Sequence, residues 1–187
     1  MKKLNSVSKK LAFTAMMAAL CAVATYAIAI PFPSGVGYFN VGDVIVLLAG
    51  WMLGPIYGAF AAGIGSMLSD FFLGFVAYMP ATFLVKGGVA LIGGALYGLC
   101  KKCIKKESLD FLPRIIAGFV SEVFMVAGYF FFEAVVLGLG AGALAGILGN
   151  LLQGICGCVG AVAVVSALYP RATVRTLFPA IYKRSGE

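Results

Sequence analysis

Residues 81–106 read ATFLVKGGVALIGGALYGLCKKCIKK, an apolar segment of about twenty residues that ends in a cluster of lysines. A helix of this length crosses the hydrocarbon core of a bilayer. The apolar part contains one charge, Lys86. All other Lys and Arg residues fall in three polar stretches: Lys2, Lys3, Lys9 and Lys10; Lys101, Lys102, Lys105, Lys106 and Arg114; and Arg171, Arg175, Lys183 and Arg184.

The composition places the chain in a membrane. Hydrophobic residues make up 62% of it and charged residues 11%, whereas about half of a soluble domain is apolar. The net charge of +7 flanks apolar segments, as in cytoplasmic loops, and so does not indicate nucleic-acid binding. The chain has no histidine, and its five cysteines lack a metal-binding spacing, so we expect no metal site, no cofactor and no enzymatic activity.

The apolar segments predict an all-α membrane protein of six transmembrane helices in a single domain, residues 1–187. An even number of crossings with basic loops inside places both termini in the cytoplasm. The first segment resembles a secretory signal with a cleavage site at Ala27-Ile28-Ala29, but it is long enough to be kept as a span. The predicted spans are Leu11–Ile30, Asp43–Leu53, Ile56–Phe75, Ala81–Cys100, Phe111–Leu137 and Ala143–Leu168.

The second span is too short for a simple crossing. Its eleven residues cover about 16 Å of a core of about 30 Å. Gly54-Pro55 then interrupts the apolar run, because proline disfavours helix at the residue before it. The second and third spans are therefore either two helices, as we predict, or one long broken helix.

Several charged side chains lie inside the predicted spans. Each costs about 2.5–3.5 kcal/mol at the centre of a membrane helix, so it should face the protein interior or a wet cavity. Asp70 and Lys86 each lie about five residues from the outer end of their helix, roughly 8 Å below the surface, and we predict that they pair.

Two further helices carry polar stripes. Glu122, Tyr129 and Glu133 fall within about 40° on one helix face. Asn150 and Gln153 share a face with small glycines. Such groups either line a ligand pocket or only join helices by hydrogen bonds. We favour the pocket for Asn150 and for the pair of Asp70 with Lys86; for Glu133 the two interpretations have equal weight.

The outer loop Pro31–Asn40 is rich in proline, glycine and aromatic residues. It either covers the cavity as a lid or anchors Phe32, Tyr38 and Phe39 at the membrane interface. No phosphate-binding G-x-x-x-x-G-K-[ST] motif occurs, so any pumping would draw on an ion gradient or on a partner protein. Small residues at four-residue spacing on the first helix, Ala15 with Ala19 and Ala18 with Ala22, favour docking to a separate membrane subunit.

Five segments resemble the substrate-binding S components of energy-coupling factor (ECF) transporters. They begin at Leu11 (LAFTAMMAAL), Tyr38 (YFNVGDVIVLL), Leu53 (LGPIYGA), Gly63 (GIGSMLSD) and Pro80 (PATFLVKG). The resemblance implies a six-helix vitamin-binding subunit that works with a transmembrane T component and two ATPase subunits. It also implies an outward-facing ligand site under the first outer loop and a contact of the first helix with the T component. The source would be the plasma membrane of a Gram-positive-type bacterium.

The segments around Asn40 and Pro80 are similar to the subgroup for riboflavin, hydroxymethylpyrimidine or pyridoxine-like compounds. We favour a small pyridine or pyrimidine vitamin, with riboflavin, pantothenate or another vitamin as alternatives. An ion-coupled secondary transporter and an envelope scaffold protein remain as other classes. The expected substrate-binding residues are Tyr38, Asn40, Asp70, Tyr78, Lys86, Glu122, Tyr129, Asn150 and Gln153, and the expected partner-binding residues are Ala15, Ala18, Ala19 and Ala22.

Overall fold

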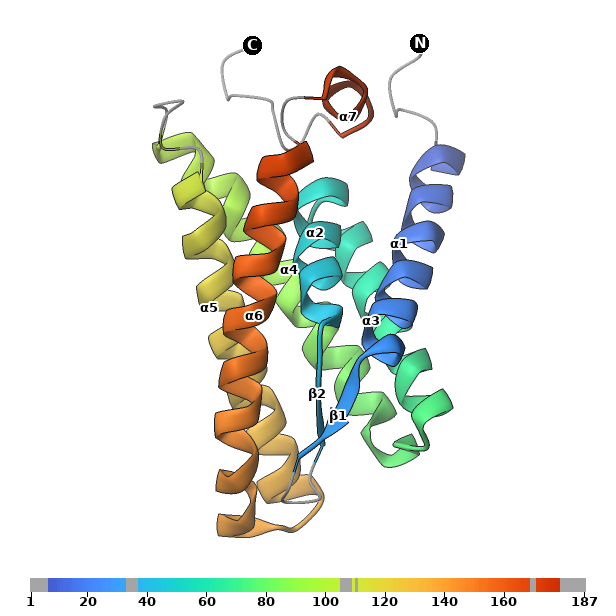
Figure 1. Ribbon diagram of the computed structural model, residues 1–187, viewed down its shortest axis with the longest axis vertical. Coiled ribbons are helices and arrows are strands. Elements are labelled where there is room, and N and C mark those ends of the chain that lie inside the picture. The colour runs from blue at the N-terminus through green and yellow to red at the C-terminus, as the bar shows by residue number, and fades with distance from the viewer. Residues whose placement is uncertain (1–6, 33–36, 105–108, 110, 169–170, 179–187) are drawn as a thin grey trace.

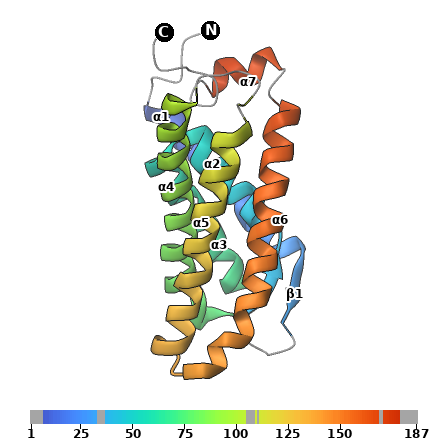
Figure 2. The ribbon, with the colours of Figure 1, turned by 90° about the vertical axis from the view of Figure 1, so that its left-hand side faces the viewer.

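The computed structural model describes residues 7–32, 37–104, 109, 111–168 and 171–178, and these form an upright helical bundle (Figures 1 and 2). Its α-helices are α1 (Val7–Ala27), α2 (Gly42–Leu53), α3 (Pro55–Leu73), α4 (Met79–Cys103), α5 (Phe111–Phe131), α6 (Leu144–Leu168) and the short α7 (Ala172–Leu177). Two short strands, β1 (Ala29–Pro31) and β2 (Tyr38–Asn40), lie between α1 and α2. The remaining turns are η1 (Val76–Tyr78), the π-helical η3 (Phe132–Val136) and η4 (Gly140–Ala143).

The all-α membrane fold is confirmed. Within the described residues, five helical stretches are long and apolar enough to cross a membrane, and α2 is a shorter apolar helix. The first helix ends earlier than predicted, at Ala27 rather than Ile30, because the chain turns into β1. β1 pairs antiparallel with β2, with Ala29 opposite Asn40 and Pro31 opposite Tyr38. The sequence pattern did not predict these strands.

The short length of α2 is explained by β2, which leads directly into it (Figure 1). The strand carries the chain from the outer side into the bundle, and α2 completes the crossing over its twelve residues. Extended backbone at membrane depth is tolerated where it is buried in protein or lines a cavity. Gly54, with φ of 83°, ends α2, and Pro55 begins α3, so the chain forms two helices here and not one broken helix.

The first helix uses its small residues in two ways. Ala18 and Ala22 are half-buried against α3: the backbone of Ala18 lies against Gly65, and the Ser69 hydroxyl donates to the Ala22 carbonyl at 2.8 Å. Ala15 and Ala19 are exposed. Ala18 and Ala22 thus pack in part within the chain, and the partner-binding role of all four alanines stays a prediction.

The described basic residues other than Lys86 gather at one end of the bundle. Lys9 and Lys10 lie in the first turns of α1, Lys102 lies at the end of α4, and Arg171 follows α6. These helix ends share the upper end in Figure 1. Lys2, Lys3, Lys105, Lys106, Lys183 and Arg184 lie outside the described residues. By the positive-inside rule this end is expected to face the cytoplasm.

Candidate functional site

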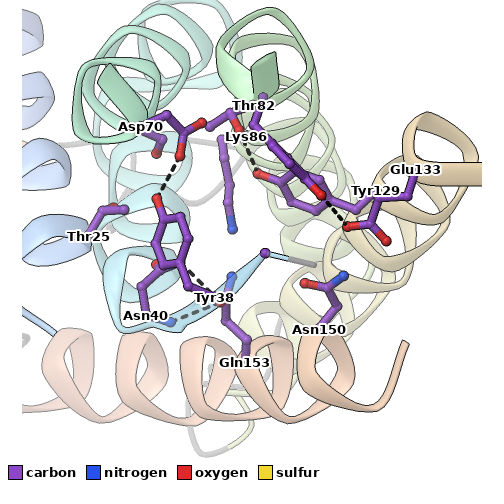
Figure 3. A pocket seen from close by; sticks show the side chains of 13 residues that line it. Thr25, Tyr38, Asn40, Asp70, Thr82, Lys86, Tyr129, Glu133, Asn150 and Gln153 are labelled. Atoms are coloured by element: carbon purple, nitrogen blue, oxygen red, sulfur yellow. Dashed lines mark hydrogen bonds between the residues drawn. The ribbon is translucent and has the colours of Figure 1, made fainter. Parts of the chain in front are cut away.

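A pocket lies in the half of the bundle away from the termini, where β2 meets α3, α4, α5 and α6 (Figure 3). Its empty volume is about 370 Å³, including the part that opens to solvent. The described residues that line it are Thr25, Gly37, Tyr38, Asn40, Ser66, Asp70, Tyr78, Thr82, Lys86, Tyr129, Glu133, Asn150 and Gln153.

A buried ion pair forms one wall of the pocket. The Lys86 ammonium lies 2.5 Å from Oδ1 of Asp43 at the start of α2, and both side chains are almost fully buried. The predicted pair of Lys86 with Asp70 is therefore wrong as a direct contact, although both residues line the pocket. A buried cation needs a nearby anion to offset its lost hydration, and Asp43 supplies that charge.

Gln153 connects this ion pair to the strand. Its Nε2 donates to Oδ2 of Asp43 at 2.7 Å, and its Oε1 accepts from both the backbone N–H and the side-chain Nδ2 of Asn40 at 3.0 Å. Oδ1 of Asn40 then accepts from the backbone N–H of Gly42 at 2.9 Å, which satisfies an unpaired donor at the start of α2. One hydrogen-bonded chain thus fixes β2, α2, α4 and α6 to one another.

Asp70 on α3 holds the other side of the strand. The Tyr38 hydroxyl donates to Oδ1 of Asp70 at 2.7 Å. This hydrogen bond ties β2 to the pocket wall.

Aromatic side chains complete the walls. The Tyr129 hydroxyl donates to Thr82 Oγ1 at 3.1 Å, and the Lys86 ammonium lies 5.5 Å from the centre of the Tyr129 ring. The Tyr78 hydroxyl donates to Glu133 Oε1 at 3.4 Å. The pocket thus offers aromatic faces beside hydroxyl, amide and carboxylate groups.

The described residues of the outer loop lie at the pocket instead of only anchoring at the interface. Its described residues Gly37, Tyr38 and Asn40 all line the cavity. Phe32 packs against α6 at Gly149, where a Cβ atom would collide with its ring. Of the two interpretations of this loop, the structure supports the lid.

The pocket brings together all the predicted substrate-binding residues except Glu122. Glu122 is only 5% exposed and packs against Gly154, outside the described lining, so the structure does not place it at the pocket and its substrate-binding role stays a prediction. The prediction missed Thr25, Ser66 and Thr82 as lining residues, and Asp43 as the partner of Lys86. Spacing could have found two of these, since Ser66 and Thr82 each lie one helical turn before a predicted site residue, Asp70 and Lys86 respectively.

A polar pocket under a lid, inside a bundle of membrane helices, defines a membrane protein that binds a small solute. Residues 5–170 match the family described as the ECF-type riboflavin transporter, S component, and the chain belongs to this family. It is a multi-pass membrane protein and the S component of an ECF-type transporter. The family is one of transporter subunits, which agrees with the expectation that the chain is not an enzyme.

Two further proteins are similar to this chain. An uncharacterized protein in the gap 3' region of Pyrococcus woesei is 31% identical over 137 residues, which cover 73% of this chain and 86% of the relative. The solved structure of the S component of a bacterial ECF transporter matches with a TM-score of 0.66 at 21% identity, covering 88% of this chain and 98% of that one. The second match shows a shared fold. Neither comparison supports the expected Gram-positive-type source.

Proposed function

We propose that this S component binds a small pyridine or pyrimidine vitamin, or a precursor of one, of the pyridoxine or hydroxymethylpyrimidine type. The observation that carries the proposal is the character of the lining. Every described lining residue is a glycine or carries a hydroxyl, amide, carboxylate or ammonium group, and none is aliphatic, phenylalanine or tryptophan. Such a wall suits a small ring with polar substituents around its edge, because each polar group of the site must find a partner when the ligand excludes water.

In this proposal, different side chains contact different parts of the ligand. The rings of Tyr38 and Tyr129 offer faces for an aromatic ligand, and the amide of Asn150 faces the cavity, where it can both donate to and accept from a ring edge (Figure 3). Tyr38 and Asn40 belong to the strand that closes the site, so binding and lid position are coupled.

Riboflavin is the second candidate, because the matching family is described as a riboflavin transporter component. Its three fused rings carry methyl groups on one edge, and such a ligand gains most from apolar walls. No aliphatic side chain is among the described lining residues, which favours the smaller ring.

The proposed partners are a T component and two ATPase subunits that drive transport. The exposed Ala15 and Ala19 of α1 form the proposed contact with the T component, since small residues one helical turn apart allow close approach of another helix. Uptake by this chain alone, in vesicles that contain no ATPase, would instead support an ion-coupled secondary transporter.

The test is equilibrium binding of purified chain in detergent to pyridoxine, hydroxymethylpyrimidine, riboflavin and pantothenate. We expect the small rings to bind most tightly and Asn150→Ala to weaken that binding at least tenfold. Ser166→Ala is the matched control, since this exposed serine bonds only to its own helix at Val162. Tightest binding of riboflavin would support the second candidate. If no ring compound binds, the proposed class of ligand is refuted. If Asn150→Ala binds with full affinity, the proposed role of Asn150 is refuted.

A further inference from the structure

Acidic side chains outnumber basic ones in the described lining of the pocket. Asp70 and Glu133 are acidic and Lys86 is basic. Asp43 already neutralises Lys86 through the buried ion pair. The undescribed loop residues 33–36 are Pro-Ser-Gly-Val and bring no charge. The other lysines and arginines that the structure describes lie outside this lining, so the described part of the chain supplies no second cation for the pocket.

Both carboxylates also have an oxygen without a partner. Oδ2 of Asp70 and Oε2 of Glu133 are buried and accept no hydrogen bond from the described residues, and each of these side chains is only 2% exposed. The hydroxyls of Thr25 and Ser66, which line the same pocket, are buried and unpaired too. A buried polar atom without a partner is unfavourable, so a ligand group that bonded to these atoms would stabilise the protein.

The backbone holds each carboxylate at the pocket. Glu133 lies in the π-helical turn Phe132–Val136, a distortion that is frequent at functional sites. Gly146 on α6 leaves room for the Glu133 carboxylate, because a Cβ atom there would lie 2.9 Å from Oε2. Asp70 is fixed on α3 by the Tyr38 hydroxyl. The two carboxylates approach the cavity from different helices, with the Lys86 chain between them in Figure 3.

We propose that the ligand of this pocket carries a positively charged nitrogen, such as an ammonium on a one-carbon arm of the ring, which binds the unpaired oxygen of Asp70 or that of Glu133. The inference rests on the proposed function, which supplies the small aromatic ring. An ammonium has three N–H donors and no acceptor, so it matches carboxylate oxygens and the hydroxyls of Thr25 and Ser66. A neutral hydroxymethyl group supplies one donor and leaves the negative charge unbalanced.

The test compares ligands that differ only in this group. Pyridoxamine and pyridoxine share one ring and differ by an aminomethyl against a hydroxymethyl arm, and the aminomethyl and hydroxymethyl forms of 4-amino-2-methylpyrimidine make a second pair. Binding to purified chain is measured near pH 7.5, where the amines are protonated. We expect the amine of at least one pair to bind tenfold or more tightly than its alcohol.

Variants of the two carboxylates then test which residue causes the preference for the amine. Asp70→Asn and Glu133→Gln keep the size of the side chain and remove its charge, and we expect at least one of them to reduce the preference to threefold or less. Glu107→Gln removes a carboxylate from the segment that joins α4 to α5, whose joined ends lie at the opposite end of the bundle, and should keep the full preference. Equal or tighter binding of both alcohols in the wild-type chain would overturn this inference and leave the proposed function standing. A preference that survives in both pocket variants would overturn it too, and failure of all four rings to bind would refute both proposals.

Discussion

Replacing Lys86 by methionine tests whether the buried ion pair stabilises the fold. Methionine keeps most of the length of the lysine side chain and removes its charge. Asp43 has no exposed surface, so in the variant its carboxylate keeps the hydrogen bond from Gln153 but loses its counter-ion. Removing one partner of a buried pair costs about 3–5 kcal/mol, because the other charge stays buried. For a chain of this size that loss corresponds to a fall in Tm of roughly 6–20 °C.

The second half of this prediction uses the partner residue. Asp43→Asn combined with Lys86→Met removes both charges while an amide remains to bond Gln153, so the double variant should regain most of the lost stability. Thermal unfolding of purified protein in detergent gives the measurement, followed by the fluorescence of the single, buried Trp51.

The control is Lys102→Met, the same substitution at an exposed position on the same helix, which should change stability by less than about 0.5 kcal/mol. The reasoning is refuted if Lys86→Met melts within about 2 °C of wild type. It is also refuted if the double variant is no more stable than Lys86→Met.

Three further predictions concern other buried contacts. Glu122→Gln should keep or raise the Tm, since neither carboxylate oxygen of this buried side chain has a hydrogen-bond partner among the described residues; a clear drop in thermal unfolding would contradict this. Gly50→Ala should lose about 1–3 kcal/mol in the same assay because its Cβ would collide with the backbone of α4, whereas Gly98→Ala, where a Cβ meets open space, should cost nothing. Tyr38→Phe should weaken ligand binding several-fold in equilibrium dialysis, because it frees the lid strand from Asp70; unchanged affinity would show that this hydrogen bond does not hold the lid.

The helices were predictable from sequence because their signals are local. Apolar runs between basic clusters located the long helices, and Gly54-Pro55 marked the boundary between α2 and α3. Most of the pocket was predictable as well, since a charged or amide side chain inside a span must face the protein interior. The partner of Lys86 was not. Counting along helices places Asp70 and Lys86 at equal depth, but it does not say which way each side chain points.

The prediction also treated Asp43 as the outer end of a span. Because β2 carries the chain into the bundle first, α2 begins within it, and Asp43 reaches Lys86. Pairing of a short strand depends on distant contacts, here the bonds of Asn40 with Gln153, and no local pattern announces it. The π-helical turn Phe132–Val136 also has no local sequence signal, and it shifts the helical register at Glu133. A helical wheel therefore gave no firm role for this residue.

The deeper start of α2 and the register shift at Glu133 change the role that we infer for Lys86. Lys86 is the one basic residue outside the three basic stretches of the sequence, and a cation in that position suggests a contact for an anionic ligand group. Its charge is instead taken up by Asp43, and the same carboxylate, through Gln153, holds the strand that closes the pocket. Any substitution at Lys86 therefore acts on the lid and the fold together, so a loss of binding there would not identify a ligand contact. The charges left to meet a ligand are those of Asp70 and Glu133, and selectivity between charged and neutral rings is the measurement that separates recognition from folding.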